Sequence, residues 1–380
     1  MAGRPVRVLL TVPRLASTSG PYREMMAIAK YLPRGEFELT VCSLRRRGYR
    51  ETSPRLFDLG VDCFVSEYRP KGDSWSYFKN VPASLRAQRE IDRRGPFDVQ
   101  HSLDFSSLPF EAFLARRKSR FYVFNQGTMN EYGRRAMLRL KVRLSHRVIA
   151  ISDSVMRLLH ELGAASAKLR KVSLGIDLED LPEGRPGSAQ DGLWDVLSVG
   201  QIIPRKRHED AIRALSRVSA ALPRLKLRIA GGVVDETYYR GLQNLVSELG
   251  LSERVEFLGL RSDVPQLMLS SAALIHCADS EAFGWVLVEA MAEGVPVIAA
   301  KVDGPEEILE DGRAGILVAA GDVAGFAEAL LRVVGDRATA RELAERGRRR
   351  VEALYSARAM AERIADVYRE LVAEKAAVSD

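Results

Sequence analysis

Short apolar runs alternate with amphipathic stretches along the whole 380-residue chain. Runs of about four to eight residues rich in Val, Ile, Leu and Phe are typical of buried parallel strands, and the longer patterned stretches between them are typical of helices. This alternation predicts an α/β protein with two doubly wound, Rossmann-like parallel sheets.

The pattern gives two sets of elements. Strands are expected at 7–12, 37–44, 61–66, 97–103, 120–125 and 146–152, and then at 195–200, 226–232, 255–259, 272–278, 296–301 and 315–320. Helices are expected near 21–32, 74–93, 105–117, 133–144, 153–162, 208–221, 236–249 and 285–293, with three more after Asp322. Ligands of such sheets bind at the carboxyl ends of the strands.

Length and composition support two domains. A chain of 380 residues exceeds one ordinary core, and residues 178–192 are rich in Pro, Gly and acidic residues. We therefore expect a first domain over 1–178, a linker over 179–192 and a second domain over 193–356.

No run approaches the roughly 18–20 apolar residues of a membrane span. The interrupted N-terminus argues against a signal peptide, and the three cysteines have no metal-ligand spacing, which favours reduced thiols in the cytoplasm.

Charge is distributed unevenly. The net charge is +7, yet residues 1–178 hold 32 Lys and Arg against 17 Asp and Glu, while the remainder holds 25 against 33. A basic first domain favours a partner with phosphates or an anionic membrane surface. Solvated helix faces explain the same excess equally well, and both interpretations stay open.

The segment at residues 280–318 carries the most specific pattern in the chain. Glu281 and Glu289 stand eight positions apart around a Phe283–Gly284 turn, which opens onto a helix. Free N–H groups and the helix dipole favour an anion such as a diphosphate at this N-terminus. A small-residue helix, a buried strand at 295–300 and a Gly-Pro-Glu-Glu corner follow.

This order of acid, Phe-Gly, acid, Ala-Met-Ala, Gly-x-Pro and Gly-Pro-Glu-Glu closely resembles the donor-site signature of retaining glycosyltransferases of family 4, which have the GT-B fold. The resemblance implies two Rossmann-like domains facing across a cleft, with the final helix, 357–380, packed back on the first domain. It also implies a nucleotide-diphosphate sugar as donor substrate, no cofactor and no metal.

The resemblance assigns roles in the second domain. Glu289 matches the glutamate that accepts from the ribose hydroxyls, and Glu281 the one that faces the donor sugar. Gly200 and Lys206 match a Gly-Arg-Leu-x-x-x-Lys-Gly loop that binds the diphosphate. The family's Arg falls on Gln201 and its final Gly on Arg207, so we infer that Arg205 restores the missing charge. Further donor-binding candidates are Phe283, Gly284, Trp285, Val286, Gln201, Gly259, Arg261 and, from the other domain, Gly20.

The first domain departs from the family where a His often stands near the anomeric centre. That position is Asn125 here, followed by Gln126, and neither amide is a base near neutral pH. These two residues and His101 are candidates for the acceptor side, although a structural histidine explains His101 as well. The other histidines, at 146, 160, 208 and 276, lack ligand spacing, and no Asp-x-Asp motif is present, so we expect no metal site.

These features favour a hexosyltransferase-like, retaining enzyme of polysaccharide, lipopolysaccharide or glycolipid synthesis. We expect it in the cytoplasm or on the inner membrane face, with a sugar, lipid-linked or anionic acceptor and no nucleic-acid partner. Two alternatives remain. One is another GT-B enzyme such as a nucleotide-sugar epimerase, and the other is a non-catalytic protein that binds anionic surfaces with a decayed donor site.

Overall fold

The computed structural model describes residues 4–13, 15, 20–66, 81–103, 110–118, 120–127, 135–181 and 195–379. The chain forms two compact units, Met1–Ile176 with Ala357–Asp380, and Asp177–Ser356. We call them the first and the second domain and describe each by itself. The linker expected at 179–192 lies mostly outside the described residues, and so do 74–80, 105–109 and 133–134 of three predicted helices.

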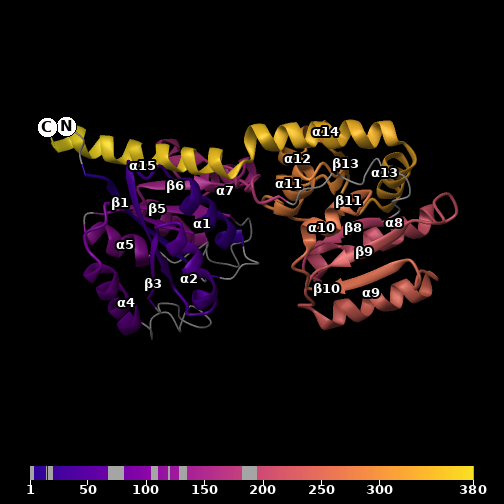
Figure 1. The fold of residues 1–380 in the computed structure, drawn as a ribbon, viewed down its shortest axis with the longest axis horizontal. Coiled ribbons are helices and arrows are strands. Elements are labelled where there is room, and N and C mark those ends of the chain that lie inside the picture. Colours follow the sequence, from indigo (N-terminus) through magenta and orange to yellow (C-terminus); the bar gives the residue numbers. More distant parts are fainter. Residues whose placement is uncertain are drawn as a thin grey trace. The chain divides into compact units, whose positions relative to one another are not determined.

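The first domain (Figure 1) is built on a seven-stranded parallel sheet of order β3-β2-β1-β4-β5-β6-β7. Its strands are β1 Val6–Val12, β2 Phe37–Ser43, β3 Asp62–Val65, β4 Val99–Ser102, β5 Phe121–Gln126, β6 Arg147–Ala150 and β7 Leu169–Lys171. The central strands are apolar on both faces, because helices cover both sides of the sheet. Six of these strands match the predicted runs, and β7 was not predicted.

Helices of the first domain follow the amphipathic stretches. They are α1 Gly20–Tyr31, α2 Tyr49–Asp58, α4 Val81–Arg93, α5 Phe110–Arg117, α6 Arg135–Leu144, α7 Asp153–Glu161 and α15 Ala357–Ser379, with the short η1 Ser166–Lys168. Among these, α2 was not predicted, since it is strongly charged and contains Pro54. Ser152 caps α7 by accepting a hydrogen bond from the Val155 N–H.

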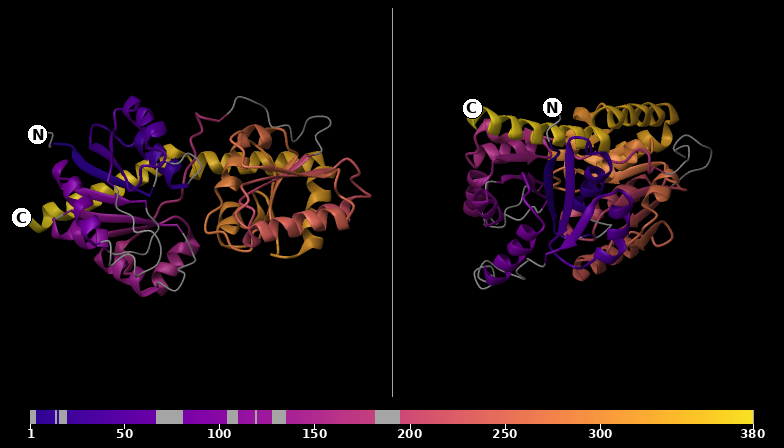
Figure 2. Two further views of the ribbon diagram at one scale, coloured as in Figure 1. Left: turned by 90° about the horizontal axis from the view of Figure 1, so that it is seen from below. Right: turned by 60° about the vertical axis from the view of Figure 1, so that its left-hand side comes forward.

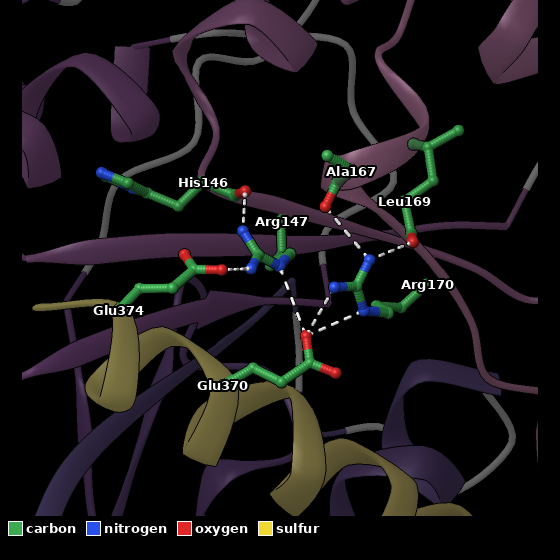
Figure 3. A network of polar contacts seen from close by, with 7 residues as sticks. All are labelled: His146, Arg147, Ala167, Leu169, Arg170, Glu370 and Glu374. Carbon is green, nitrogen blue, oxygen red and sulfur yellow. Dashed lines mark hydrogen bonds and ion pairs between the residues drawn. The ribbon is translucent and has the colours of Figure 1, made fainter. Parts of the chain in front are cut away.

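The last helix, α15, is part of the first domain and lies beside its other elements in both figures (Figures 1 and 2). Buried Arg147 at the start of β6 pairs with Glu370 and Glu374 of this helix (Figure 3). Arg170 of β7 also binds Glu370, with Nε and Nη2 at 2.8 and 2.7 Å from the same carboxylate oxygen. Two arginines on neighbouring strands thus hold one helix.

The second domain has a six-stranded parallel sheet of order β10-β9-β8-β11-β12-β13. The strands are β8 Asp195–Val199, β9 Lys226–Ala230, β10 Val255–Gly259, β11 Ala273–His276, β12 Val297–Ala300 and β13 Ile316–Val318. The helical elements are η3 Pro204–Lys206, α8 His208–Val218, α9 Glu236–Glu248, α10 Val264–Leu269, α11 Trp285–Ala292, α12 Asp303–Ile308, η4 Glu310–Gly312, α13 Val323–Gly335 and α14 Arg337–Leu354.

Both sheets confirm the prediction of two doubly wound, Rossmann-like domains. In the second sheet, chain order runs outward in one direction from β8 and in the other from β11. The loops after these two neighbours therefore diverge at a topological switch point, where open α/β sheets bind ligands. Within the part of the chain that the structure describes, no helix is long and apolar enough to cross a bilayer.

Candidate functional site

Two loops meet at the switch point of the second domain. The loop after β8 contains η3 and leads into α8, and the loop after β11 leads into α11. Lys206 Nζ lies 2.5 Å from Glu281 Oε2, and the two side chains are only 13% and 18% exposed. The basic and acidic residues that the sequence suggested separately therefore form one ion pair.

Further contacts join the same two loops. Arg205 Nη1 donates to the carbonyl of Ser280 at 2.5 Å, and the Asp279 N–H donates to the carbonyl of Arg205 at 3.2 Å. Because these contacts flank the Lys206–Glu281 pair, they fix the spacing of its cation and carboxylate. Arg205 lies beside Lys206 as expected, but its guanidinium binds the protein chain in this structure.

The ionised form of the Glu281 carboxyl is strongly favoured over the protonated form. Burial alone would raise the pKa of this carboxyl, but His276 and Lys206 beside it outweigh burial and hold the pKa far below its usual range. A mostly buried carboxylate is thus ionised at neutral pH and available as a fixed negative charge.

The turn before α11 depends on two glycines. Gly284 has φ 106°, a conformation that side-chain-bearing residues rarely adopt, and the Leu287 N–H bonds to its carbonyl at 3.0 Å. Gly304 packs directly on the turn, since a Cβ at that position would lie 2.2 Å from the Phe283 carbonyl oxygen. The Gly304 N–H also donates to the Glu281 carbonyl at 2.9 Å. The Gly-Pro-Glu corner thus supports the acidic loop.

The buried side chain of Phe283 packs beneath the surface of the turn. It is 3% exposed, and its ring contacts Trp285 and Tyr355 edge to face, with centroids 6.1 and 5.9 Å apart. Trp285 and Val286 are half-buried in the first turn of α11, and Glu289 is half-buried in the middle of that helix. The buried Phe283 ring is a structural support, whereas the other three side chains reach the surface.

Glycines line the carboxyl ends of β8, β9 and β10. The Gly200 N–H donates to Ala230, and the Gly231 N–H donates to Gly259, at 2.9 and 2.8 Å. A Cβ on Gly231 would lie 1.7 Å from the Gly200 carbonyl oxygen, so no larger residue fits there. The Lys206 side chain passes over Gly200. Gly200 thus belongs to the site geometry, and the close approach of two backbones requires glycine at position 231.

Two other donor candidates lie at the edge of the sheet. Gly259 is exposed at the end of β10, and exposed Arg261 pairs with Asp263 through Nε and Nη2 at 2.8 and 2.6 Å. Their contact with a nucleobase stays a prediction. Gln201, by contrast, follows Gly200 directly; its side chain is exposed, and its carbonyl lies 3.2 Å from His208 Nε2.

The loop after β8 contains a second departure from the family pattern. Arg207 stands where the family has Gly, and its backbone has φ 49° and ψ 45°, the left-handed conformation that glycine adopts readily. Buried His208 follows, with Ser198 Oγ 3.1 Å from Nδ1. Burial lowers the pKa of His208 to about 4, so this histidine is neutral at physiological pH.

In the first domain, Asn125 and His101 belong to a buried hydrogen-bond chain. Tyr368 of α15 bonds to His101 Nδ1 at 2.6 Å, His101 Nε2 bonds to Asn125 Oδ1 at 2.7 Å, and Asn125 Nδ2 donates to Glu24 of α1. An amide oxygen only accepts, so His101 carries its proton on Nε2 and accepts from the tyrosine. Gln126 is also fully buried.

Burial determines the protonation states of the side chains in this hydrogen-bond chain. It lowers the pKa of His101 to about 4 and raises the pKa of Glu24 to about 8, so both are neutral at pH 7. All four side chains are at most 1% exposed. The role of Asn125, Gln126 and His101 on the acceptor side stays a prediction, and Gly20, at the start of α1, stays a donor candidate by resemblance. Among the described residues, no group of three or more His, Cys, Asp or Glu could hold a metal ion.

His276 also belongs to the site, although the motif does not contain it. It ends β11, is 3% exposed, and places Nε2 3.5 Å from Glu281 Oε2. The spacing of the histidines in the sequence bears only on metal binding, so it does not indicate this contact. One feature of the sequence could have indicated this contact: the histidine ends a buried strand, five residues before an acid of the motif.

The fold and site define a two-domain α/β protein with a charged switch-point site, and comparison with known proteins gives its family. The model of "Glycosyl transferases group 1" matches residues 185–350, and that of "Glycosyltransferase Family 4" matches residues 20–180. Together the two models match most of the chain, which belongs to the group 1 glycosyltransferases.

Curated relatives match over part of their length. The lipopolysaccharide core biosynthesis glycosyltransferase LpsE of Rhizobium meliloti is 32% identical over 180 residues, which cover 47% of this chain and 50% of the relative. The N-acetyl-alpha-D-glucosaminyl L-malate synthase of Bacillus anthracis is 28% identical over 223 residues, 57% of each chain. The alignments thus span about half the length of these relatives.

Solved structures support the GT-B fold. The crystal structure of Anabaena Alr3699/HepE in complex with UDP superposes with a TM-score of 0.81 at 21% identity, covering 96% of this chain and all of the other. WaaG, a glycosyltransferase involved in lipopolysaccharide biosynthesis, gives 0.69 at 16% identity, with 95% and 99% covered.

Proposed function

We propose that this protein transfers a sugar from a nucleoside diphosphate sugar to an acceptor, with retention of anomeric configuration, in the synthesis of a polysaccharide, lipopolysaccharide or glycolipid. One observation carries the proposal. The Lys206–Glu281 pair stands at the switch point of the second sheet, beside the N-terminus of α11. A cation, a helix N-terminus and a carboxylate at one edge of the sheet match the parts of a nucleotide sugar.

Catalysis in this proposal is mainly electrostatic. As the diphosphate departs, Lys206, Arg205 and the N-terminus of α11 stabilise its negative charge. Glu281 positions the sugar and offsets the positive charge that builds on the anomeric carbon. Glu289 accepts from the ribose hydroxyls. No cofactor or metal takes part, so a chelator leaves the rate unchanged.

The acceptor in this proposal is anionic or lipid-linked. Support comes from the basic first domain and from exposed side chains of α5 and α6, where Phe113 and Leu140 are 45% and 44% exposed on helices that also carry exposed arginines. Apolar side chains flanked by cations suit peripheral contact with an anionic membrane on its inner face. Liposomes with and without anionic lipid test this contact, and equal co-sedimentation contradicts it.

A donor panel tests the reaction. The protein is incubated with uridine, guanosine and adenosine diphosphate sugars, with and without a sugar acceptor, and free nucleoside diphosphate and product configuration are measured. The proposal expects diphosphate release that rises with acceptor and a product of retained configuration. Epimerised donor without release indicates the epimerase alternative. Nucleotide binding without release indicates a protein that only binds.

A further inference from the structure

The carboxylate of Glu281 has two basic neighbours in the second domain. Lys206 Nζ lies 2.5 Å and His276 Nε2 3.5 Å from the same oxygen, Oε2. In the described part of the chain, no group makes a regular hydrogen bond to this histidine nitrogen. The His276 ring therefore faces the carboxylate at a distance longer than a normal hydrogen bond.

The charges around His276 explain why Lys206 is now the closer partner. Burial lowers the pKa of His276, Glu281 opposes this shift, and the charges of Lys206 and Arg205 add to it. The other titratable neighbour, His208, is neutral and bonded to Ser198 and the Gln201 carbonyl. With the ammonium present, His276 is a neutral ring beside an ion pair.

Donor binding disturbs this arrangement. A bound diphosphate competes with Glu281 for the ammonium of Lys206, and an ammonium that turns toward the phosphate oxygens moves away from the carboxylate. A mostly buried carboxylate that loses its cation is strongly destabilised unless another charge replaces it. His276 Nε2 needs to move by less than about 1 Å to reach normal hydrogen-bonding distance.

We propose that Lys206 exchanges partners when a nucleoside diphosphate binds, and that His276 takes up a proton from solvent and replaces it as the partner of Glu281. This inference rests on the proposed function of the same site. The imidazole gains one N–H and one positive charge, and no other bond changes. His276 is then a positioning residue, which keeps Glu281 ionised and oriented while Lys206 serves the diphosphate.

Calorimetry tests the exchange without an activity assay. Binding of uridine, guanosine and adenosine diphosphates is measured at pH 7 in two buffers of different ionisation enthalpy, which gives the number of protons taken up. The nucleotide also exchanges protons, so the measured quantity is the difference between wild type and His276→Gln. The wild type takes up more protons, by up to about one per site, because glutamine donates to Glu281 but does not titrate.

Two further variants sharpen the result. His276→Leu removes both the proton and the hydrogen bond, and its affinity for the diphosphate falls about tenfold or more, whereas His276→Gln stays within about threefold of the wild type. Leu242→Ala, a core change in α9, is the matched control for loss of packing, since Leu242 is 2% exposed. It keeps the proton uptake of the wild type. Thermal unfolding of each variant confirms that it folds.

The outcomes separate this inference from the proposed function. Equal proton uptake in the wild type and His276→Gln overturns the exchange, even if sugar transfer is observed. Uptake that depends on His276, without transfer to any acceptor, supports the exchange and overturns the proposed function. Absence of binding for all three diphosphates overturns both.

Discussion

Arg207 holds a left-handed backbone conformation while its guanidinium makes a two-pronged ion pair with Asp210. Nε and Nη2 lie 2.7 and 3.1 Å from the two carboxylate oxygens, and Asp210 is 2% exposed in the first turn of α8. A non-glycine residue in this conformation is strained by about 1–2 kcal/mol. The pair offsets that strain, because Asp210 would otherwise be buried without its cation.

Replacing Arg207 by two different residues separates the two effects. Arg207→Ala keeps the strained backbone and loses the pair, whereas Arg207→Gly loses the pair but relieves the strain. We expect both to be less stable than the wild type, with the glycine variant more stable than the alanine variant by about 1 kcal/mol. Urea unfolding at pH 7 measures the difference. An alanine variant at least as stable as the glycine variant would show that the backbone is not strained.

Gly304 is expected to tolerate no side chain. A Cβ at this position meets the Phe283 backbone at 2.2 Å, so Gly304→Ala must displace the turn that carries Glu281. We expect a loss of at least about 2 kcal/mol in the free energy of unfolding and weaker nucleotide binding. Gly241→Ala is the control, because nothing lies within 4 Å of its Cβ in α9. It stabilises the fold by about 0.5–1 kcal/mol. Similar effects of the two changes would contradict the packing argument.

Lys206→Ala is expected to lower turnover by about 10²–10³ at saturating donor, the effect of losing one group that stabilises the transition state. The measurement is steady-state release of nucleoside diphosphate. Arg213→Ala, a change of a cation on the exposed face of α8, serves as the control and leaves turnover unchanged. Unaltered kinetics in Lys206→Ala would remove this residue from the mechanism.

Glu281→Ala is expected to abolish transfer and largely preserve binding of the free nucleoside diphosphate. The reason is that its carboxylate is assigned to the sugar and the reacting centre, while the diphosphate is held by other groups. Calorimetry with free nucleotide and a transfer assay on the same sample distinguish the two properties. Collapse of nucleotide binding would reassign Glu281 to the diphosphate.

Glu24 makes stability depend on pH. Burial raises its pKa from 4.5 to about 8 in the folded protein, so the folded state binds this proton more tightly than the unfolded chain. The free energy of unfolding therefore falls as pH rises from about 4.5 to 8. Glu24→Gln retains an acceptor for Asn125 but does not titrate. Its stability relative to wild type should rise over this window and level off above it. A constant difference from pH 5 to 8 in urea unfolding would exclude this titration.

Most of the fold was predictable because its strands are apolar on both faces. The runs at 7–12 and 296–301 contain almost nothing but buried residues, so period and length alone mark them as central strands. The missed strand, β7, has three residues, of which only Leu169 is buried. The missed helix, α2, contains four charged residues and Pro54 among its ten positions, so it lacks the apolar stripe that marks a helix. Some elements are stabilised mainly by contacts with the rest of the fold and only weakly by their own residues. Such elements show little of the hydrophobic periodicity from which strands and helices are predicted.

The site was predictable in its parts but not in its connections. The motif gave Glu281 and Lys206 separately, yet they are 75 positions apart in the chain, and no local spacing predicts their ion pair. His276 escaped notice because its partner is a carboxylate rather than a metal ion. Asn125 was identified as a departure from the family, but its bonds to His101 and Glu24 come from three different elements. Such long-range pairs follow from the sheet order, which the sequence pattern does not contain.

The buried Tyr368 has a consequence for biosynthesis. Its hydroxyl completes the hydrogen-bond chain of the first domain, yet it lies in α15, which is synthesised after the whole second domain. The second domain is fully synthesised before that helix emerges, so it can reach its native state earlier. The first domain is therefore completed only after the second domain has been made, and a nascent chain that stops before Ala357 has a first domain without α15, which chaperones would have to shield.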